Sequence, residues 1–247
     1  MLAAAVVCVL KWHKMSKERN FILTMKNKIN YAKEWIFTHK YCYAMLYLIF
    51  YLITFFTLDF TMKPKYIIHC ALDDAIPFCE YFAVFYFAWF PAFLLALVGY
   101  MIYNKRDFQQ LWFIMFNGMT FCFIIYILLP NGLDLRVDLP NRNIFCFLMN
   151  MVWKADAAVN VCPSIHVSSS VAVALVTARS KLFEQHRIRQ AAIILLMIMI
   201  CISTMFVKQH SFIDVLCGTA VSLVLYAIAY YTNWRRILEG TRLEILL

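Results

Sequence analysis

The sequence contains few charged residues for its length. Of its 247 residues, 15% are Asp, Glu, Lys or Arg, whereas 64% are hydrophobic. A typical soluble domain carries about 25% charged residues, and a fold of this size leaves much of its surface exposed. The shortage of charge therefore excludes an ordinary water-soluble domain and favours a chain whose outer surface faces lipid.

Further absences narrow the function. No group of His, Cys, Asp or Glu has the spacing of a metal site, so neither a metal nor another cofactor is expected. The net charge is +9, but the basic residues do not alternate with aromatic residues as in nucleic-acid platforms, so no nucleic-acid partner is expected. The chain has no internal repeat and no low-complexity segment, and nothing in it predicts the oligomeric state.

Hydrophobic runs dominate the rest of the sequence. A helix needs about 20 predominantly apolar residues to cross a bilayer. Six runs are candidates, at residues 41–60, 82–103, 111–129, 167–178, 191–207 and 212–231. They predict an all-α membrane protein built as a six-transmembrane-helix bundle. The fourth run is short and rich in Ser and Ala, which makes it the weakest of the six.

The distribution of Lys and Arg predicts the orientation, because cytoplasmic loops of membrane proteins are enriched in these residues. If the N-terminus is cytoplasmic, 17 of the 23 Lys and Arg residues fall on the cytoplasmic side. We therefore expect a multi-pass protein of the plasma membrane with a cytoplasmic N-terminus. This orientation and contact with anionic membrane lipids together explain most of its positive charge.

The predicted organisation is one membrane domain with two short flanks. Residues 41–234 form the six-helix domain. Residues 1–40 form a basic cytoplasmic juxtamembrane segment, whose Lys, Trp and Phe residues suit a helix lying in the membrane interface. Residues 235–247 form a short cytoplasmic tail.

Three polar segments within residues 130–214 lie at the ends of predicted helices, where polar residues next to hydrocarbon are costly and therefore informative. They are Asn131–Arg136, Asn160–His166 and Ser203–Asp214. The number of helices between them places all three on the same, extracytoplasmic side. A single site can therefore be assembled from segments that are far apart in the sequence.

The third segment contains a histidine and an aspartate with helical spacing. His210 and Asp214 are four residues apart, which places them one turn from each other on one helix face. The carboxylate can accept a proton from one imidazole nitrogen and leave the other nitrogen as a nucleophile or base. The alternative is a structural pair that caps the helix and anchors it at the interface.

The second segment has the features of a helix start, with Ser164 as its N-cap. The N–H groups and dipole of a helix N-terminus favour a phosphate. His166 would stand beside that phosphate as a proton donor, although a histidine that only faces the interface is the structural alternative. Arg136 and Lys208 are the nearest cations in sequence, and both residue types bind phosphate.

Together the three segments resemble the motifs of the type 2 phosphatidic acid phosphatase superfamily, which are K-x6-R-P, P-S-x-H and S-R-x5-H-x3-D. The second motif is complete as Pro163–His166. Ser203, His210 and Asp214 have the spacing of the third motif, in which Thr204 occupies the Arg position.

The first motif departs from the family pattern. Arg136 matches its Arg, but Leu129 replaces its Lys and Val137 replaces its Pro. The stretch Phe206–His210 resembles a subgroup that includes inositol phosphorylceramide synthase-like proteins. In such members, Lys208 would supply the charge that the third motif lacks.

The resemblance implies an integral membrane phosphatase that hydrolyses a lipid phosphate, either a phosphomonoester or a diphosphate, on the extracytoplasmic face. His210 would attack the phosphorus and form a phosphohistidine, with Asp214 orienting it. His166 would protonate the leaving group. The phosphoryl oxygens would be bound by Arg136, Ser164 and Lys208.

Two other functions stay open on the sequence alone. A lipid phosphotransferase, similar to inositol phosphorylceramide or sphingomyelin synthases, would pass a headgroup to a lipid alcohol in place of water. The departures from the motifs also allow a non-catalytic membrane protein of the same fold. Neither the motifs nor the composition identifies the lipid.

Overall fold

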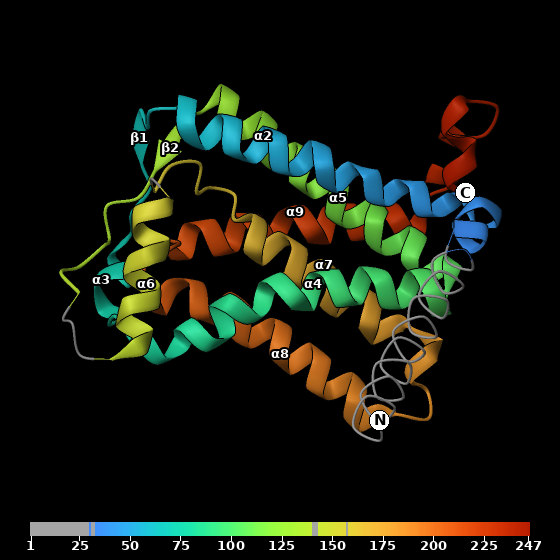
Figure 1. Ribbon diagram of the computed structural model, residues 1–247. Helices are drawn as coiled ribbons and strands as arrows, with labels where there is room; N and C mark the ends of the chain where they lie inside the picture. Colours follow the sequence, from blue (N-terminus) through green and yellow to red (C-terminus); the bar gives the residue numbers. More distant parts are fainter. Residues whose placement is uncertain (1–29, 31–32, 140–142, 157) are drawn as a thin grey trace, which may run out of the picture. The chain divides into compact units, whose positions relative to one another are not determined.

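The computed structural model describes residues 30, 33–139, 143–156 and 158–247 (Figure 1). The chain divides into two units, one of residues 1–43 with Leu246 and one of residues 44–245 with Leu247. Most of the predicted juxtamembrane segment, residues 1–29 and 31–32, lies outside the described residues. The second unit contains every element that concerns the function.

The second unit is a bundle of α-helices. Its long helices are α2 (Tyr47–Thr61), α4 (Ala83–Tyr103), α5 (Lys105–Leu128), α7 (Ile165–Arg179), α8 (Arg187–Phe206) and α9 (Phe212–Tyr231). The shorter elements are β1 (Tyr66–Ile67), α3 (Ala71–Ala75), β2 (Asn131–Gly132) and α6 (Ile144–Ala155). Short 3-10 helices of the described chain lie at η1 (Lys40–Leu46), η2 (Glu80–Phe82), η3 (Lys181–Phe183), η4 (Trp234–Ile237) and η5 (Arg242–Leu246), of which η1 and η5 include residues of the first unit.

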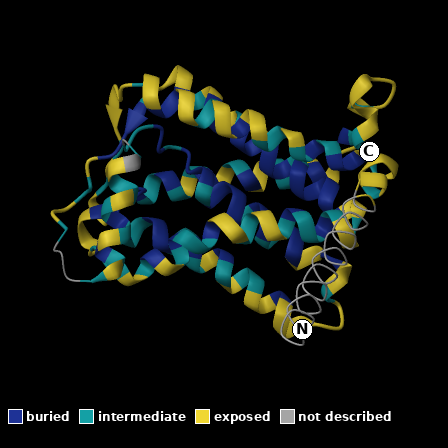
Figure 2. Cartoon of the chain, viewed as in Figure 1, coloured by how far each residue is buried: buried dark blue, intermediate teal, exposed yellow. Residues whose placement is uncertain are grey.

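Five helical segments are long and apolar enough to cross a membrane. They are Lys40–Thr61, Glu80–Tyr103, Lys105–Leu128, Arg187–Phe206 and Phe212–Tyr231. Side chains on their outward faces are exposed (Figure 2), and Ile53, Phe60 and Leu95 are 63%, 80% and 70% exposed. The all-α membrane class is therefore confirmed, but six spans are not, because the fourth predicted run forms a helix of only 15 residues.

That short helix, α7, lies inside the bundle. It makes its most extensive contacts with α5, α8 and α9, and nine of its 15 residues are buried. Many of these are Ser, Ala and Val, whose small side chains allow neighbouring helices to approach closely. A helix surrounded by protein needs less apolar surface than one that faces lipid. This explains why the sequence of α7 is less hydrophobic than that of the spanning helices.

The α7–α9 contact is closest at Gly218 of α9. A Cβ atom at this position would lie 2.6 Å from the backbone oxygen of Ser164 and 3.2 Å from the Cβ of Val167. We therefore predict that Gly218→Ala pushes the start of α7 away and destabilises the fold by about 1–3 kcal/mol, as overpacking does. Thermal unfolding of the purified protein in detergent measures this loss.

Gly99→Ala in α4 is the matched control for this prediction. Both glycines lie inside helices, where alanine gains about 1 kcal/mol of helix propensity, but no atom lies within 4 Å of a Cβ built at Gly99. The control is expected to unfold at the wild-type temperature or above it. Equal unfolding temperatures for the two variants would contradict the packing argument.

The predicted extracytoplasmic loops contain elements that hydropathy does not reveal. β1 pairs in parallel with β2, so that Tyr66 lies opposite Asn131. The side chain of Asn143 caps α6 by accepting the N–H of Cys146 at 3.0 Å. These elements gather at the end of the bundle where α5 and α8 finish and α7 and α9 begin (Figure 1). The three polar segments meet at this end.

Candidate active site

A cavity of about 290 Å³ lies at this end of the bundle, and we call it the histidine cavity. Its walls come from α2, α4, α5, the end of α6, the start of α7 and the connection between α8 and α9. Most of its lining is aromatic or aliphatic. Its charged, amide and imidazole side chains are Asp59, Asp156, Asn160, His166, Gln209 and His210.

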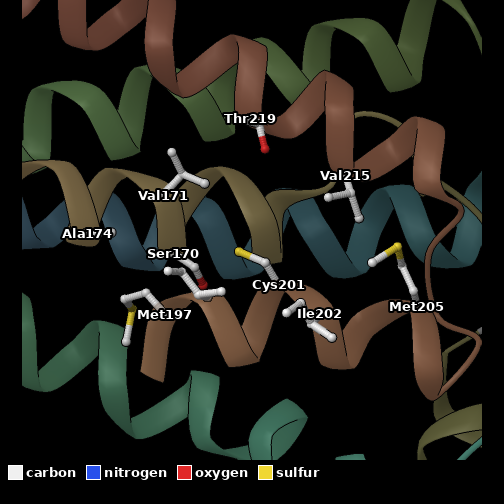
Figure 3. A pocket seen from close by; sticks show the side chains of 10 residues that line it. Ser170, Val171, Ala174, Met197, Cys201, Ile202, Met205, Val215 and Thr219 are labelled. Atoms are coloured by element: carbon white, nitrogen blue, oxygen red, sulfur yellow. The ribbon is translucent and has the colours of Figure 1, made fainter. Parts of the chain in front are cut away.

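A different pocket, of about 180 Å³, lies between α7, α8 and α9 (Figure 3). Apolar side chains from all three helices point into it, among them Val171, Met205 and Val215. Its lining includes no histidine and no charged residue. The histidine cavity is therefore the better candidate for phosphate chemistry.

His210 is held by the carboxylate of Asp214. The Nδ1 atom of His210 lies 3.3 Å from Oδ2 of Asp214, whose carboxylate is fully buried. The same oxygen accepts the N–H of Ser211 at 2.9 Å as part of the capping box that begins α9. The two side chains thus meet as their spacing predicts, although through a capping turn and not through a continuous helix. This contact uses Nδ1 of His210 and leaves Nε2 for another partner.

His166 lies in the first turn of α7, against aromatic rings of α4. Its ring centre is 5.0 Å from that of Tyr86 and 4.3 Å from that of Trp89. The ring of His210 lies 5.6 Å from it on another side. Residues from two distant segments therefore form a pair of imidazoles in one cavity, and α4 fixes the orientation of one of them.

Buried polar atoms without a hydrogen-bond partner cluster around this pair. Five of the nine such side-chain atoms in the described residues belong to this region, namely Arg136 Nε, Asn160 Oδ1, His166 Nε2, Gln209 Nε2 and Asp214 Oδ1. Each unsatisfied buried polar group costs about 1–3 kcal/mol, and such groups are rare in native proteins. A polar ligand in the cavity could reach those that line it, Asn160 Oδ1, His166 Nε2 and Gln209 Nε2. Gln209 was not predicted from the sequence, because an amide next to a histidine carries no signal of its own.

Arg136 reaches the site indirectly. It donates to the backbone oxygens of Trp153 and Asp156 at 2.8 and 2.9 Å. These carbonyls lie at the C-terminal end of α6, where backbone oxygens lack partners within the helix. It also donates to Oε1 of Gln209 at 3.4 Å. Burial lowers the pKa of Arg136, while the nearby Asp156 carboxylate opposes that shift. Arg136 does not line the histidine cavity, so it contacts the cavity through two residues that do, Gln209 and Asp156.

The other two predicted phosphate ligands also have structural partners. The Nζ atom of Lys208 donates to the backbone oxygens of Asp73 and Ile76 in and after α3, at 2.7 and 2.5 Å. The Oγ atom of Ser164 accepts the N–H of Val167 at 3.3 Å and caps α7 as predicted. Neither side chain lines the histidine cavity. The phosphate-binding role predicted for them stays untested.

Comparison with known protein families identifies part of the chain. The family model described as PAP2 superfamily matches residues 141–238. These 98 of the 247 residues are similar to the PAP2 superfamily. The predicted resemblance is therefore confirmed for these residues, which include the second and third motifs with both histidines. No curated protein and no solved structure matches the chain significantly.

Two regions outside the matched segment hold its histidine-bearing turns in place. Asn131, which precedes α6, accepts the N–H groups of Val161 and Cys162 at 2.9 and 2.8 Å. Tyr126 of α5 donates to the backbone oxygen of Pro163 at 2.6 Å. These bonds fix the strand of chain that leads into α7, and hence the position of His166.

Asp73 of α3 attaches the connection between α2 and α4 to the PAP2 segment. Its carboxylate accepts the hydroxyl of Ser211 at 2.6 Å and the N–H of Phe212 at 2.8 Å, at the start of α9. A negative charge is favourable at a helix N-terminus. Burial acts to raise the pKa of Asp73, but these bonds and one from the N–H of Cys70 outweigh it, so the pKa is lowered. The contact is therefore present at neutral pH and is lost only as the pH falls through this lowered pKa.

We predict that Asp73→Asn lowers the stability by about 1.5–3 kcal/mol, because hydrogen bonds to a charged acceptor are lost. Asp74→Asn is the matched control, since the neighbouring Asp74 side chain is 67% exposed and surface changes are usually worth less than about 0.5 kcal/mol. Thermal unfolding of both variants measures the difference. Indistinguishable unfolding curves would show that α3 is not fastened by Asp73.

Proposed function

We propose that the chain is an integral membrane enzyme that hydrolyses a lipid phosphate, a phosphomonoester or diphosphate, through a phosphohistidine. One observation carries the proposal. His210, fixed by Asp214, and His166 line one cavity, whose lining includes buried polar atoms that lack a partner, among them Nε2 of Gln209 and Nε2 of His166. The match of residues 141–238 to the PAP2 superfamily supports a phosphatase-type reaction.

In the first step, Nε2 of His210 attacks the phosphorus and forms a P–N bond. The P–O bond to the leaving group breaks, and His166, which takes up a proton when the anionic phosphate is bound beside it, gives that proton to the leaving oxygen. In the second step, His166 removes a proton from a water molecule, which attacks the phosphorus and breaks the P–N bond. Inorganic phosphate leaves, and both histidines return to their starting states.

Charge developing on the phosphoryl oxygens needs fixed donors. The Nε2 group of Gln209 lacks a partner and lines the cavity. Arg136 contacts the other atom of the same amide, which orients the amide and adds positive charge behind it. We propose that Gln209 takes over part of the role that the sequence assigned to Lys208.

The orientation is part of the proposal. The distribution of Lys and Arg supports a cytoplasmic N-terminus and an extracytoplasmic active site, in the plasma membrane. A lipid phosphotransferase is the alternative, and it differs only in using a lipid alcohol where the phosphatase uses water. A non-catalytic protein would keep the cavity but turn over nothing.

The test is a phosphate-release assay of the purified protein in detergent, with phosphatidic acid, phosphatidylglycerol phosphate and an isoprenoid diphosphate as substrates. Release of phosphate that depends on His210 supports the phosphatase. Transfer of labelled phosphate or headgroup to an added lipid alcohol, without release to water, identifies the transferase. Absence of both activities with every lipid would contradict an enzymatic function.

A further inference from the structure

A third cavity, of about 300 Å³, lies between α4, α7 and α8, and we call it the α4–α8 groove. These three helices contact one another along the bundle (Figure 1). α4 lines the groove with Ala92, Ala96, Gly99 and Tyr103, in the half of the helix that is farther from the histidine cavity. The groove ends next to η3, which connects α7 to α8, and we call this its outer end.

The interior of the groove has no hydrogen bonds to offer a ligand. The hydroxyl groups of Tyr100 and Thr177 line it and bond to each other at 2.8 Å. In the part of the chain that the structure describes, no buried polar side-chain atom of the groove lining lacks a partner. The histidine cavity differs, because three of its lining atoms lack one. The α4–α8 groove is therefore suited to hydrocarbon and not to a polar molecule.

The groove opens on the outer surface of the bundle, which faces lipid. Leu95 and Tyr103 at its rim are 70% and 76% exposed, whereas Val173 and Met197 on its inner side are buried. Between Ala92 and Tyr103, α4 rises by about 16 Å. This is roughly half of the hydrocarbon thickness of a bilayer, which is about 30 Å. The groove therefore extends through the depth of one leaflet, where acyl chains are the molecules that can enter it.

Gly99 keeps the groove open. Small residues in spanning helices usually allow a neighbouring helix to approach closely, but no protein atom lies within 4 Å of a Cβ built at Gly99. The space beside this glycine is therefore not used for packing between helices. A water molecule occupies about 30 Å³ in the liquid and a methylene group about as much, so the groove has room for about ten methylene groups. This is the greater part of one acyl chain.

Basic side chains gather at the outer end of the groove. From the last residue of α7 to the first turn of α8, the chain contains four Lys or Arg residues and one acidic residue, Glu184. Two of the four, Arg179 and Arg187, donate to neutral side chains. The other two, Lys181 and Arg189, are exposed, and neither forms an ion pair among the described residues. Their charges are therefore available to an anionic ligand.

Both cations are close in sequence to residues that line the groove. Lys181 directly precedes Leu182, which lines the outer end. Arg189 lies one turn before Ile193 on the same face of α8, and Ile193 also lines the groove. Side chains of a helix tilt towards its N-terminus, so that of Arg189 extends beyond the outer end. The groove thus combines space for an acyl chain with positive charge at the depth of a headgroup, an arrangement that attracts anionic lipids.

We propose that the α4–α8 groove binds one acyl chain of an anionic phospholipid, whose phosphate lies between Lys181 and Arg189. The phospholipid belongs to the leaflet on the far side of the membrane from the histidine cavity. The inference is therefore independent of the proposed reaction. It assigns a defined site to an anionic lipid, in place of a general attraction between the basic connections and the membrane surface. A zwitterionic phospholipid would fit the groove equally well but would gain less from the two cations.

The test is photolabelling of the full chain in nanodiscs of phosphatidylcholine that contain a trace of phosphatidylglycerol with a diazirine in its acyl chain. We expect crosslinks concentrated on the groove residues of α4 and α8, at least about fivefold stronger than with the matching phosphatidylcholine probe. Equal labelling by the two probes, or a label spread evenly over all spanning helices, would overturn the proposal. Displacement of the label by stearate but not by unlabelled phosphatidylglycerol would also overturn it, in favour of a free fatty acid.

Two sets of variants test the parts of the site separately. Gly99→Leu should fill the groove and lower its labelling at least about fivefold, whereas Ala220→Leu, at an exposed position of α9 outside the groove, should not. Lys181→Gln combined with Arg189→Gln should remove the preference for phosphatidylglycerol. Arg236→Gln, which removes an exposed cation after α9, should preserve it. Full labelling of Gly99→Leu, or a preference that survives the double exchange, would contradict the proposal, and the comparison of probes on the wild type stands even if a variant fails to fold.

Discussion

Replacing His210 by alanine is expected to lower the rate of phosphate release by at least about 10³-fold, because loss of a nucleophile removes the covalent route. The structure supports this size of effect because Asp214 holds the imidazole at Nδ1 and leaves Nε2 for attack. Initial rates with the best lipid of the substrate panel measure it. Asp214→Asn should lie between the wild type and His210→Ala, since the imidazole stays but loses its charged partner.

His69→Ala is the control for this comparison. His69 is also in a connection at this end of the bundle, but its side chain is 44% exposed and contacts Asp74. Its removal should leave the rate within about twofold of wild type, in line with a surface change. Thermal unfolding of all three variants separates a chemical loss from a folding loss. A His210→Ala protein that folds normally and retains most of its activity would rule out His210 as nucleophile.

Replacing His166 by glutamine is expected to slow the hydrolysis of a lipid phosphate by about 10²–10⁴-fold, the usual contribution of a general acid. Glutamine cannot protonate the leaving oxygen but retains polarity in the wall formed with Tyr86 and Trp89. The loss should depend on the leaving group. With p-nitrophenyl phosphate, whose leaving oxygen is stable without a proton, the same variant should lose much less.

The ratio of the two losses is the informative quantity. A structural role of His166 would slow both substrates equally, because a displaced α7 would disturb the nucleophile as well. The wild-type enzyme, measured with both substrates in the same detergent, is the reference. Equal losses with the lipid and with p-nitrophenyl phosphate would contradict the assignment of His166 as the acid.

Much of the fold follows from the sequence because long apolar runs have few alternatives in a membrane. Five of the six predicted runs coincide with helices long and apolar enough to span. The exception, α7, is buried among other helices. A helix that is surrounded by protein does not need an apolar surface facing lipid, so a search for apolar runs detects it only weakly. The polar first turn of α5 was missed for another reason: the side chain of Asn104 accepts the N–H of Asp107 and starts the helix before its apolar part.

The site was predicted where residues are close in sequence or follow a family motif. His166, His210 and Asp214 meet in the structure. Asp73 was missed, because it is a single aspartate whose importance comes from contacts with residues far away in the chain.

Lys208 and Arg136 show the limit of reasoning from charge alone. Both are near the predicted site in sequence, but their donors are occupied largely by backbone oxygens of α3 and α6. The sequence reveals that a cationic side chain is present, but it does not reveal which hydrogen-bond acceptor that side chain contacts. The connections that supply those acceptors contain short helices, which hydropathy does not detect.

The central claim is that His210 carries the phosphoryl group during turnover. It is tested most directly by denaturing the purified protein during turnover of a lipid substrate whose phosphate is labelled with ³²P. The account predicts a label that is stable in alkali, labile in acid, located on His210 and absent from His210→Ala. An active enzyme that acquires no label, or a label that persists in His210→Ala, would contradict it.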